Sequence, residues 1–387
     1  MPGLQALTRK VLRTVGLDRK ETPRSRNPFE NLGPPEVIAI EPTLGCNIRC
    51  RMCHVSYMPD TKVQLLDVEV LKSLAFCKSK HVIIGAEFEP TIHPDFNRMM
   101  GILNGLEARI ELVSNGTRLH RLQAPALYES RLQLMTFSFD GIRKATFEHI
   151  RRGADYRQTL DNILRFRAAF PAEPPYFAIN STTMRCNLAE AAETVRFWND
   201  HGMNMVRFLF MVVRDLNPEL LQEYLYPVRD QAFAVFDDVA RMVIGDKLRL
   251  AVRCPWYWRS PLRHIFPRNF IKDAVVSDHP EAHDCPTPRQ DAQLGAWPGM
   301  SFPCKSPFTF ARILPSGHVQ LCHRFTVGNL YEEDFESIWY GPRANEVRRR
   351  LLGQTDLCRS CNYYKFCLSS RSVDVTREDY YLPAKST

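Results

Sequence analysis

The sequence predicts an α/β protein, built as a partial (β/α)6 TIM-like barrel with a small cysteine-rich C-terminal domain. Between residues 35 and 212, short apolar runs alternate with longer segments of helical periodicity, which is the pattern of βαβ units around a parallel sheet. Six such units suit an incomplete barrel better than a closed eight-fold one. Beyond residue 300, a group of cysteines marks a separate module.

Six apolar segments are expected to form the parallel strands. They are residues 36–40, 81–84, 109–113, 133–139, 176–181 and 205–210. Helical periodicity occupies the intervals, for example at 68–78, 156–169 and 188–201. Ligands bind such sheets where the strands end, and the polar motifs described below each follow one of these strands. We therefore expect the site at that edge of the sheet.

The chain is divided into five predicted segments. These are a basic N-terminal extension (1–34), the barrel core (35–212), a helical and irregular linker or substrate-facing insertion (213–300), the cysteine-bearing domain (301–370) and a tail (371–387). The extension has the spacing of a basic amphipathic helix. It either packs on the main domain or contacts an anionic membrane or partner.

Composition narrows the class of protein. The 387 residues are 44% hydrophobic, which is enough for a sizeable core. No apolar run approaches the roughly 20 residues that span a bilayer, and no secretory signal pattern is present, so we expect a soluble cytoplasmic protein without membrane contact. The net charge of +8 favours an anionic partner, and the dispersal of the basic residues argues against nucleic acid.

Twelve cysteines are the most informative feature of the composition. In a reducing compartment such cysteines serve as metal ligands or catalysts rather than in disulfides. Eight of them fall into an early and a late group, which implies two metal sites. The scattered ones are expected to be small buried apolar residues: Cys77, Cys186, Cys254 and Cys285. Cys254 and Cys285 precede the late group, so either is a candidate extra ligand.

The early group, Cys46, Cys50 and Cys53, directly follows the first predicted strand. One short loop would hold three corners of a four-iron cluster and leave one iron open to chelate a cofactor through an amine and a carboxylate. This segment resembles the cysteine loop of the radical S-adenosylmethionine (SAM) superfamily, with Met52 where the family often has an aromatic residue. The alternatives are a zinc site, a ferredoxin-like cluster with a fourth cysteine, or three unrelated buried cysteines.

The resemblance implies the cofactors and the type of reaction. In the family, SAM binds the open iron of a [4Fe-4S] cluster and is cleaved reductively to a 5′-deoxyadenosyl radical, which abstracts hydrogen from a substrate. A reductant such as flavodoxin or ferredoxin is then expected as a partner.

The segment after the second strand resembles the family's Gly-Glu-Pro segment, which receives the methionyl ammonium of SAM. Its His-Pro-Asp-Phe continuation aligns Glu89 as the matching acid. Phe88 replaces the glycine before it, so the close backbone approach expected there is altered. Glu87 is the alternative acceptor.

Three further cofactor contacts are implied by the same resemblance. The turn around Asn115 is similar to the family's Thr-Asn-Gly-Thr turn, and Ser138 with Asp140 is similar to a Ser-x-Asp-Gly step that faces the ribose. Arg151 falls where an arginine pairs with the methionyl carboxylate. On the fifth strand, Asn180 is expected to contact the cofactor or the substrate.

The late cysteine group resembles the SPASM and twitch auxiliary-cluster domains. A β-hairpin around its Pro-Ser-Gly turn would bring Cys304 and Cys322 together. Cys358 and Cys361 would complete four thiolates, with Cys367 as a spare or alternate ligand. Four thiolates saturate a cluster, so its expected role is electron transfer.

Arg371 stands where a two-cluster domain would need a further cysteine, so we expect one auxiliary [4Fe-4S] cluster. A structural zinc knuckle is the alternative. His323, next to Cys322, is a candidate proton acceptor during substrate oxidation, against the alternative of a structural histidine.

The predicted function is that of a radical SAM enzyme that oxidises or rearranges a small metabolite, such as a sugar or aminocyclitol in natural-product or glycan biosynthesis. One alternative is crosslinking, epimerisation or oxidation of a ribosomally made peptide. An alternative of another class is a non-catalytic iron–sulfur or zinc scaffold.

Overall fold

The computed structural model describes residues 32–57, 63–78, 80–122, 131–170, 175–211, 218–254, 264–265, 306–322 and 325–353. The chain divides into two units, Met1–Gly33 and Pro34–Thr387. Every element named below belongs to the second unit. The predicted N-terminal helix and the tail lie outside the described residues. Within the described part, no helix is both long and apolar enough to cross a membrane.

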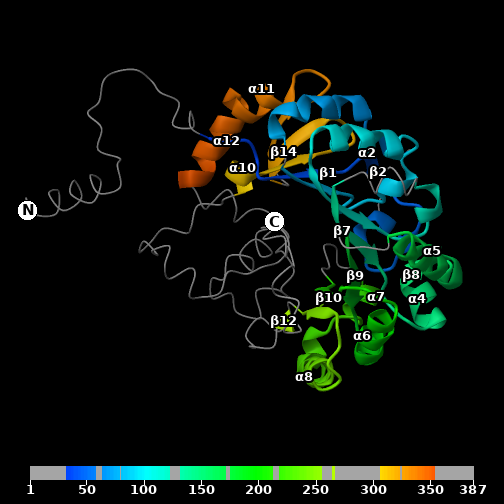
Figure 1. Cartoon of the computed structure of the whole chain (residues 1–387). Helices are drawn as coiled ribbons and strands as arrows, with labels where there is room; N and C mark the ends of the chain where they lie inside the picture. The colour runs from blue at the N-terminus through cyan, green and yellow to red at the C-terminus, as the bar shows by residue number, and fades with distance from the viewer. Residues whose placement is uncertain are drawn as a thin grey trace, which may run out of the picture. The chain divides into compact units, whose positions relative to one another are not determined.

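One sheet organises the second unit (Figure 1). Its strand order is β12-β11-β10-β9-β7-β6-β5-β1-β13-β14-β15. Six consecutive parallel strands form its centre: β1 Val37–Ile40, β5 His81–Ile84, β6 Arg109–Ser114, β7 Leu132–Ser138, β9 Tyr176–Thr183 and β10 Met205–Phe210. These are the six predicted strands, and the predicted α/β partial barrel is confirmed.

Two short strands extend the sheet beyond β10. β11 (Ala251–Arg253) runs parallel to β10, and β12 (His264–Ile265) pairs with β11 in the antiparallel sense. Neither was predicted, because strands of three and two residues are too short to produce a periodic signal.

The C-terminal module extends the opposite edge. β13 (Phe310–Ile313) and β14 (His318–Cys322) form the predicted hairpin, and β15 (Phe325–Asn329) follows. Gly317 provides the positive φ of 78° in the turn, where a Cβ atom would lie 2.5 Å from Asn329 Oδ1. β13 also pairs in parallel with β1, so the module is part of the barrel sheet and not only attached to it.

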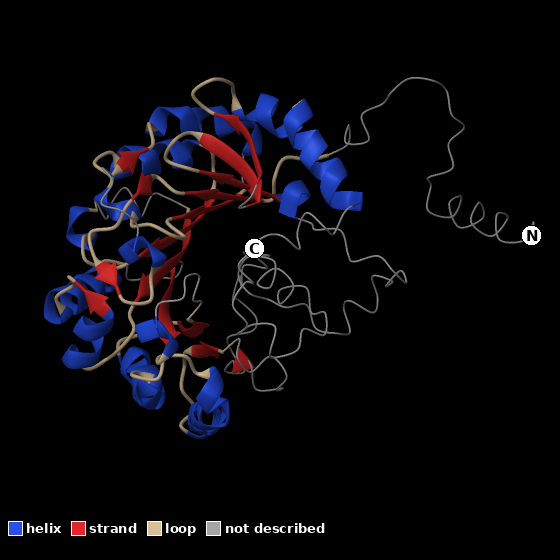
Figure 2. Cartoon of the chain, turned by 180° about the vertical axis from the view of Figure 1, so that it is seen from behind, coloured by secondary structure: helices blue, strands red, loops and turns tan. Residues whose placement is uncertain are grey.

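Helices lie along the convex side of the curved sheet (Figure 2). The longer ones are η2 Val68–Cys77, α2 Phe96–Gly105, α4 Lys144–Ile150, α5 Tyr156–Ala168, α6 Ala191–Asp200 and α8 Arg229–Gly245. Large apolar strand residues fill the layer beneath them. For example, Phe137 on β7 packs against Phe166 of α5, and Phe208 on β10 packs against Phe236 of α8. This layer is the main core.

Shorter elements connect the sheet to its loops. They are β2 Thr43–Leu44, β3 Arg49–Cys50, η1 His54–Tyr57, β4 Gln64–Leu65, η3 Pro90–Ile92, η4 Leu119–Arg121, β8 Arg151–Arg152, η5 Leu188–Glu190, α7 Pro218–Leu221 and η6 Tyr226–Val228. The C-terminal module adds α10 Ser306–Thr309, α11 Phe335–Tyr340 and α12 Pro342–Gly353.

The C-terminal module packs on the barrel through aromatic rings as well as through β13. Phe76 of η2 contacts Phe335 and Tyr340 of α11, with ring centroids 5.7 and 5.9 Å apart. Tyr331 Oη accepts a hydrogen bond from the backbone amide of Asp67 at 3.0 Å. Inside the module, the buried guanidinium of Arg348 lies over the Trp339 ring at 4.4 Å.

Three of the scattered cysteines lie in described residues. Cys77 and Cys254 are buried, as expected. Cys186 is exposed, so the expectation that it is a buried apolar residue was wrong. It lies in the turn that follows β9, where the chain leaves the core before η5 begins. Cys285 lies outside the described residues.

Candidate active site

The cysteine loop begins where β1 ends and is shaped by backbone pairing. Cys50 lies in β3, whose partner is β8, so Cys50 faces Arg151 across the ladder. A tight turn carries the chain on to Cys53, whose amide donates to the Cys50 carbonyl at 3.1 Å. Ser56 Oγ donates to the same carbonyl at 2.6 Å. Cys50 is buried, and Cys46 and Cys53 are partly exposed.

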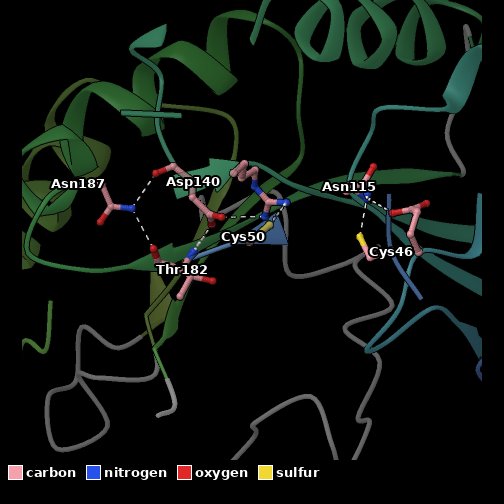
Figure 3. Close-up of polar contacts among 8 residues, drawn as sticks. Cys46, Cys50, Asn115, Asp140, Thr182 and Asn187 are labelled. Carbon is pink, nitrogen blue, oxygen red and sulfur yellow. Dashed lines mark hydrogen bonds and ion pairs between the residues drawn. The ribbon is translucent and has the colours of Figure 1, made fainter. Parts of the chain in front are cut away.

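Burial and nearby hydrogen-bond donors act on the Cys50 and Cys46 thiols. Burial raises the pKa of Cys50 to about 12, while the nearby Arg151 charge acts to lower it. Arg151 Nη1 lies 3.9 Å from Cys50 Sγ. Burial likewise raises the pKa of Cys46, and Asn115 Nδ2 donates to Cys46 Sγ at 3.5 Å (Figure 3). Burial disfavours the negatively charged thiolate form of these cysteines. Iron binds thiolates, so the positive charge of the iron would stabilise that form.

Asn115 ties the cysteine loop to the turn after β6. Its amide nitrogen also donates to Asn47 Oδ1 at 3.0 Å, and Asn47 in turn donates to Thr117 Oγ1 at 2.8 Å. Gly116 has a φ of 81°, and a Cβ atom there would lie 3.0 Å from Ile163. The structure therefore places Asn115 beside Cys46, a predicted cluster ligand, and contact of Asn115 with SAM stays a prediction.

Glu89 joins the loops that follow β5 and β6. Its carboxylate is 2% exposed and accepts four hydrogen bonds. Thr91 gives two, from N at 3.1 Å and Oγ1 at 2.5 Å; Ser114 Oγ gives one at 2.9 Å and Asn115 N another at 2.6 Å. Burial raises the pKa of Glu89, and these donors counteract the rise. In this geometry Glu89 holds the loops in position, and the predicted ammonium contact remains untested.

Glu87 faces a residue from the C-terminal module. Arg312 Nη2, on β13, lies 2.8 Å from Glu87 Oε2 and 3.3 Å from Glu41 Oε1. Glu41 directly follows β1 and is completely buried, and it accepts hydrogen bonds from the amides of Glu87 and Phe88 at 3.0 and 3.3 Å. Burial raises the pKa of Glu41 to about 7. Neither Glu41 nor Arg312 was predicted. The available signal was a charged residue directly after a buried strand for Glu41, and a charged residue inside a buried strand for Arg312.

Asp140 and Arg151 form a buried ion pair behind Cys50. Arg151 Nη2 lies 2.8 Å from Asp140 Oδ2, and Asp140 Oδ1 accepts from the Thr182 amide at 2.6 Å. Asn187 Nδ2 bonds the carbonyls of Asp140 and Thr182 at 2.7 and 2.9 Å (Figure 3). Burial raises the pKa of Asp140, and the Arg151 charge opposes this. The ribose and carboxylate contacts predicted for the pair therefore remain predictions.

Ser138 and Asn180 are register partners on β7 and β9, so their side chains lie on one face of the sheet. Asn180 Oδ1 is buried and has no hydrogen-bond partner in the described part of the chain. Such an atom fits an external donor from a cofactor or substrate.

Three cysteine thiols in one loop are the donor set of a four-iron cluster with one open iron. In the described ranges, no three His, Cys, Asp or Glu side chains are arranged to hold one ion. A cluster distributes its thiolates over several irons. Of the late group, Cys322 is half-buried at the end of β14. Its predicted companions, Cys304, Cys358, Cys361, Cys367 and the proton acceptor His323, lie outside the described residues.

Comparison with known proteins agrees with this geometry. The radical SAM superfamily model matches residues 40–213, and the model of the SPASM iron–sulfur cluster-binding domain matches residues 304–362. The AdoMet-dependent heme synthase of Methanosarcina barkeri is 25% identical over 358 residues, covering 87% of this chain and 91% of that protein.

Two further similarities cover most of the chain. The tungsten-containing aldehyde ferredoxin oxidoreductase cofactor-modifying protein of Pyrococcus furiosus is 21% identical over 347 residues, covering 87% of this chain and 90% of that protein. The structure of Streptococcus suis SuiB bound to its precursor peptide SuiA superposes with a TM-score of 0.59 at 14% identity, covering 93% of this chain and 81% of SuiB.

These matches set aside the alternative of a non-catalytic scaffold. The barrel binds a [4Fe-4S] cluster and SAM, and the C-terminal domain binds an auxiliary iron–sulfur cluster. The three-cysteine loop, held by its hydrogen bonds at the end of β1, is the feature that both the sequence and the fold assign to one family. The chain is an enzyme of the radical SAM superfamily with a C-terminal SPASM domain.

Proposed function

We propose that this enzyme oxidises or rearranges a small organic metabolite after removing a hydrogen atom from it, with the C-terminal domain carrying an electron. The observation that carries the proposal is the parallel pairing of β13 with β1. It builds the auxiliary-cluster domain onto the strand that leads into the cysteine loop. A domain placed there is well suited to exchange electrons with chemistry at the end of β1.

The cluster and SAM supply, when bound, a 5′-deoxyadenosyl radical that abstracts hydrogen. The chain's own residues prepare the site. Cys46, Cys50 and Cys53 are the ligands, and the Arg151 guanidinium near Cys50 favours the thiolate form that binds iron. Asn115 donates to Cys46 and orients it.

A two-electron oxidation requires that a second electron and a proton leave the substrate. We assign the electron to the C-terminal domain and the proton to a side chain such as His323. The electron taken up by the C-terminal domain would pass to the barrel's cluster and restore its reduced state, and an external reductant of the flavodoxin or ferredoxin type would supply the first electron.

The names of the two curated relatives favour a small-molecule substrate. One is a heme synthase and the other a cofactor-modifying protein, and each covers 87% of this chain. SuiB, solved with a precursor peptide, is similar in fold alone, so peptide modification is the second candidate. The sugar or aminocyclitol substrate expected from the sequence remains a prediction.

The test is anaerobic reconstitution followed by iron counting and product analysis. About eight irons per chain are expected for two four-iron clusters, falling to about four when Cys46, Cys50 and Cys53 are all changed to Ala. Dithionite and SAM should yield 5′-deoxyadenosine with the wild type but not with the triple variant. Cys186→Ala, at an exposed cysteine outside the site, is the matched control and should keep both readouts.

Two results would contradict the proposal. Wild-type protein with full iron content that forms no 5′-deoxyadenosine under reduction would remove the radical step. About four irons in the wild type, falling to almost none in the triple variant, would remove the auxiliary cluster and its electron-carrying role.

A further inference from the structure

A row of polar side chains crosses neighbouring strands at one level of the sheet. Arg207 on β10 is the register partner of Arg253 on β11 and, on its other side, of Asn180 on β9. Asn180 is the partner of Ser138 on β7. Partnered residues of parallel strands project to the same face, with strands about 4.8 Å apart. The two guanidinium groups therefore start from adjacent backbone positions on one face.

That face is the concave one, away from the helices. Phe208 packs on Phe236 of α8, with ring centroids 5.1 Å apart, and Arg207 precedes it, so the Arg207 side chain points to the opposite face. Arg207 Nη1 reaches Glu111 Oε1 on β6 at 3.5 Å although β9 and β7 lie between their strands. Side chains that are separated by two strands can reach each other only on the concave face of a curved sheet.

The charged groups on this face are largely buried but keep a small exposed fraction. The Arg207 and Glu111 side chains are 14% and 7% exposed, and Arg253 is 7% exposed. His81 Nε2 lies 3.8 Å from Glu111 Oε2 on the far side of the same carboxylate. Groups at this depth interact with a ligand in a low effective dielectric, where a charged hydrogen bond is stronger than at the surface.

Two buried oxygens between these charges have no hydrogen-bond partner in the described ranges. Thr136 on β7 is completely buried, and neither its Oγ1 nor Asn180 Oδ1 has a hydrogen-bond partner among the described residues. Thr136 is the register partner of Ala178, two residues before Asn180, so it lies on the same concave face. Unpartnered buried polar atoms are rare in native proteins and indicate a missing ligand or water.

We propose that Arg207 and Arg253 bind an oxyanion of the substrate, with the Thr136 hydroxyl as a further donor and with Asn180 Oδ1 accepting from a donor group of the substrate beside it. This inference rests on the proposed function and names its substrate class: a metabolite bearing a carboxylate or phosphate group. Guanidinium forks match both groups geometrically and form the stronger, charge-assisted hydrogen bonds. The net charge of +8 acts in the same direction by attracting anions to the protein.

SAM also carries a carboxylate, so the test must separate cofactor from substrate. The holoenzyme is titrated at constant ionic strength with succinate, with inorganic phosphate and with SAM, by calorimetry. Arg207→Met and Arg253→Met are compared with Arg196→Met, which alters an exposed arginine of α6 paired with Asp246. Arg207→Lys keeps the charge without the fork and reports on folding.

We expect saturable binding of succinate or phosphate to the wild type and to the Arg196 variant. Arg207→Met and Arg253→Met should each weaken it about 10-fold to 100-fold, with Arg207→Lys between, while SAM affinity stays unchanged. The preferred probe identifies the oxyanion as carboxylate or phosphate.

Three outcomes overturn the proposal: no saturable probe binding to the wild type, equal binding to all variants, or an equal loss of SAM affinity, which would assign the row to the cofactor. Formation of 5′-deoxyadenosine by the same preparation is measured in parallel. If it occurs while oxyanion binding fails, only the present inference falls; if it does not occur, the proposed function itself falls.

Discussion

Arg312 and Glu41 form a buried ion pair, with 3.3 Å between Arg312 Nη2 and Glu41 Oε1, that joins the C-terminal hairpin to the residue following β1. The two residues are far apart in the sequence. Their contact lies between the auxiliary-cluster domain and the start of the cysteine loop. The contact links the stability of the C-terminal domain to the geometry of the cysteine loop.

Removing the arginine should leave the carboxyl groups of Glu41 and Glu87 without their buried cation. Arg312→Met is expected to lower the free energy of unfolding by about 3–5 kcal/mol, the usual cost of breaking a buried pair. Denaturant unfolding measures the change. Arg349→Met, which removes an exposed arginine paired with Glu346, should change the stability by less than about 1 kcal/mol. Equal stability of the two variants would contradict a structural role for Arg312.

The stability contribution of Glu41 should depend on pH. Its pKa is raised from 4.5 to about 7, mainly by burial, so the folded state binds a proton more tightly than the unfolded state. The contribution is therefore fully present below pH 4.5, falls as the pH rises toward 7, and is level above. The slope approaches about 1.4 kcal/mol per pH unit within this window.

Comparison with Glu41→Gln isolates this effect, because glutamine does not titrate. The free energy of unfolding of the wild type minus that of the variant should decrease between pH 5 and pH 7. A difference that is constant across this range would show that Glu41 titrates normally.

Asn115 should affect the cluster more than the fold. Asn115→Ala removes the donor to Cys46 Sγ and the link to Asn47. We expect the rate of SAM cleavage to fall about 10-fold to 100-fold, the usual effect of losing a residue that orients a metal ligand. The cluster potential should become more negative, because a donor to a ligand sulfur stabilises the reduced cluster. Gln133→Ala, near the start of β7, is the control and should leave the cleavage rate and the cluster potential unchanged.

Gly85 should tolerate no side chain. Its φ is 80°, and a Cβ atom would lie 2.5 Å from Pro90 and 2.8 Å from the Val113 carbonyl oxygen. Gly85→Ala is expected to lower the melting temperature by several degrees and to displace Glu89 from its four donors.

Gly101→Ala is the matched control for Gly85. Gly101 lies inside α2, and a Cβ atom there would meet nothing within 4 Å. The substitution should stabilise the protein by about 0.5–1 kcal/mol because alanine favours the helix. If both alanine variants melt at the same temperature, the backbone conformation at Gly85 is not the constraint inferred here.

Local pattern was sufficient for the barrel and for the position of the cluster loop. The alternation of apolar runs and helical segments located all six central strands, because burial on both faces requires continuous apolar residues. Spacing alone placed Cys46, Cys50 and Cys53 in one loop. The Pro-Ser-Gly turn located the hairpin of β13 and β14, since Gly317 supplies the left-handed conformation that the turn needs.

Tertiary structure alone decided which distant residues meet. The pairing of β13 with β1, the Arg312–Glu41 contact and the alignment of Arg207 with Arg253 join segments that no local periodicity relates. The structure also showed that Glu89 and Asp140 accept hydrogen bonds from the backbone amides of Asn115 and Thr182, while their contacts with SAM stay predictions. A sequence specifies which side chains are available at each strand end. Strand order and register, which depend on burial over the whole sheet, decide which of them lie close enough to act together.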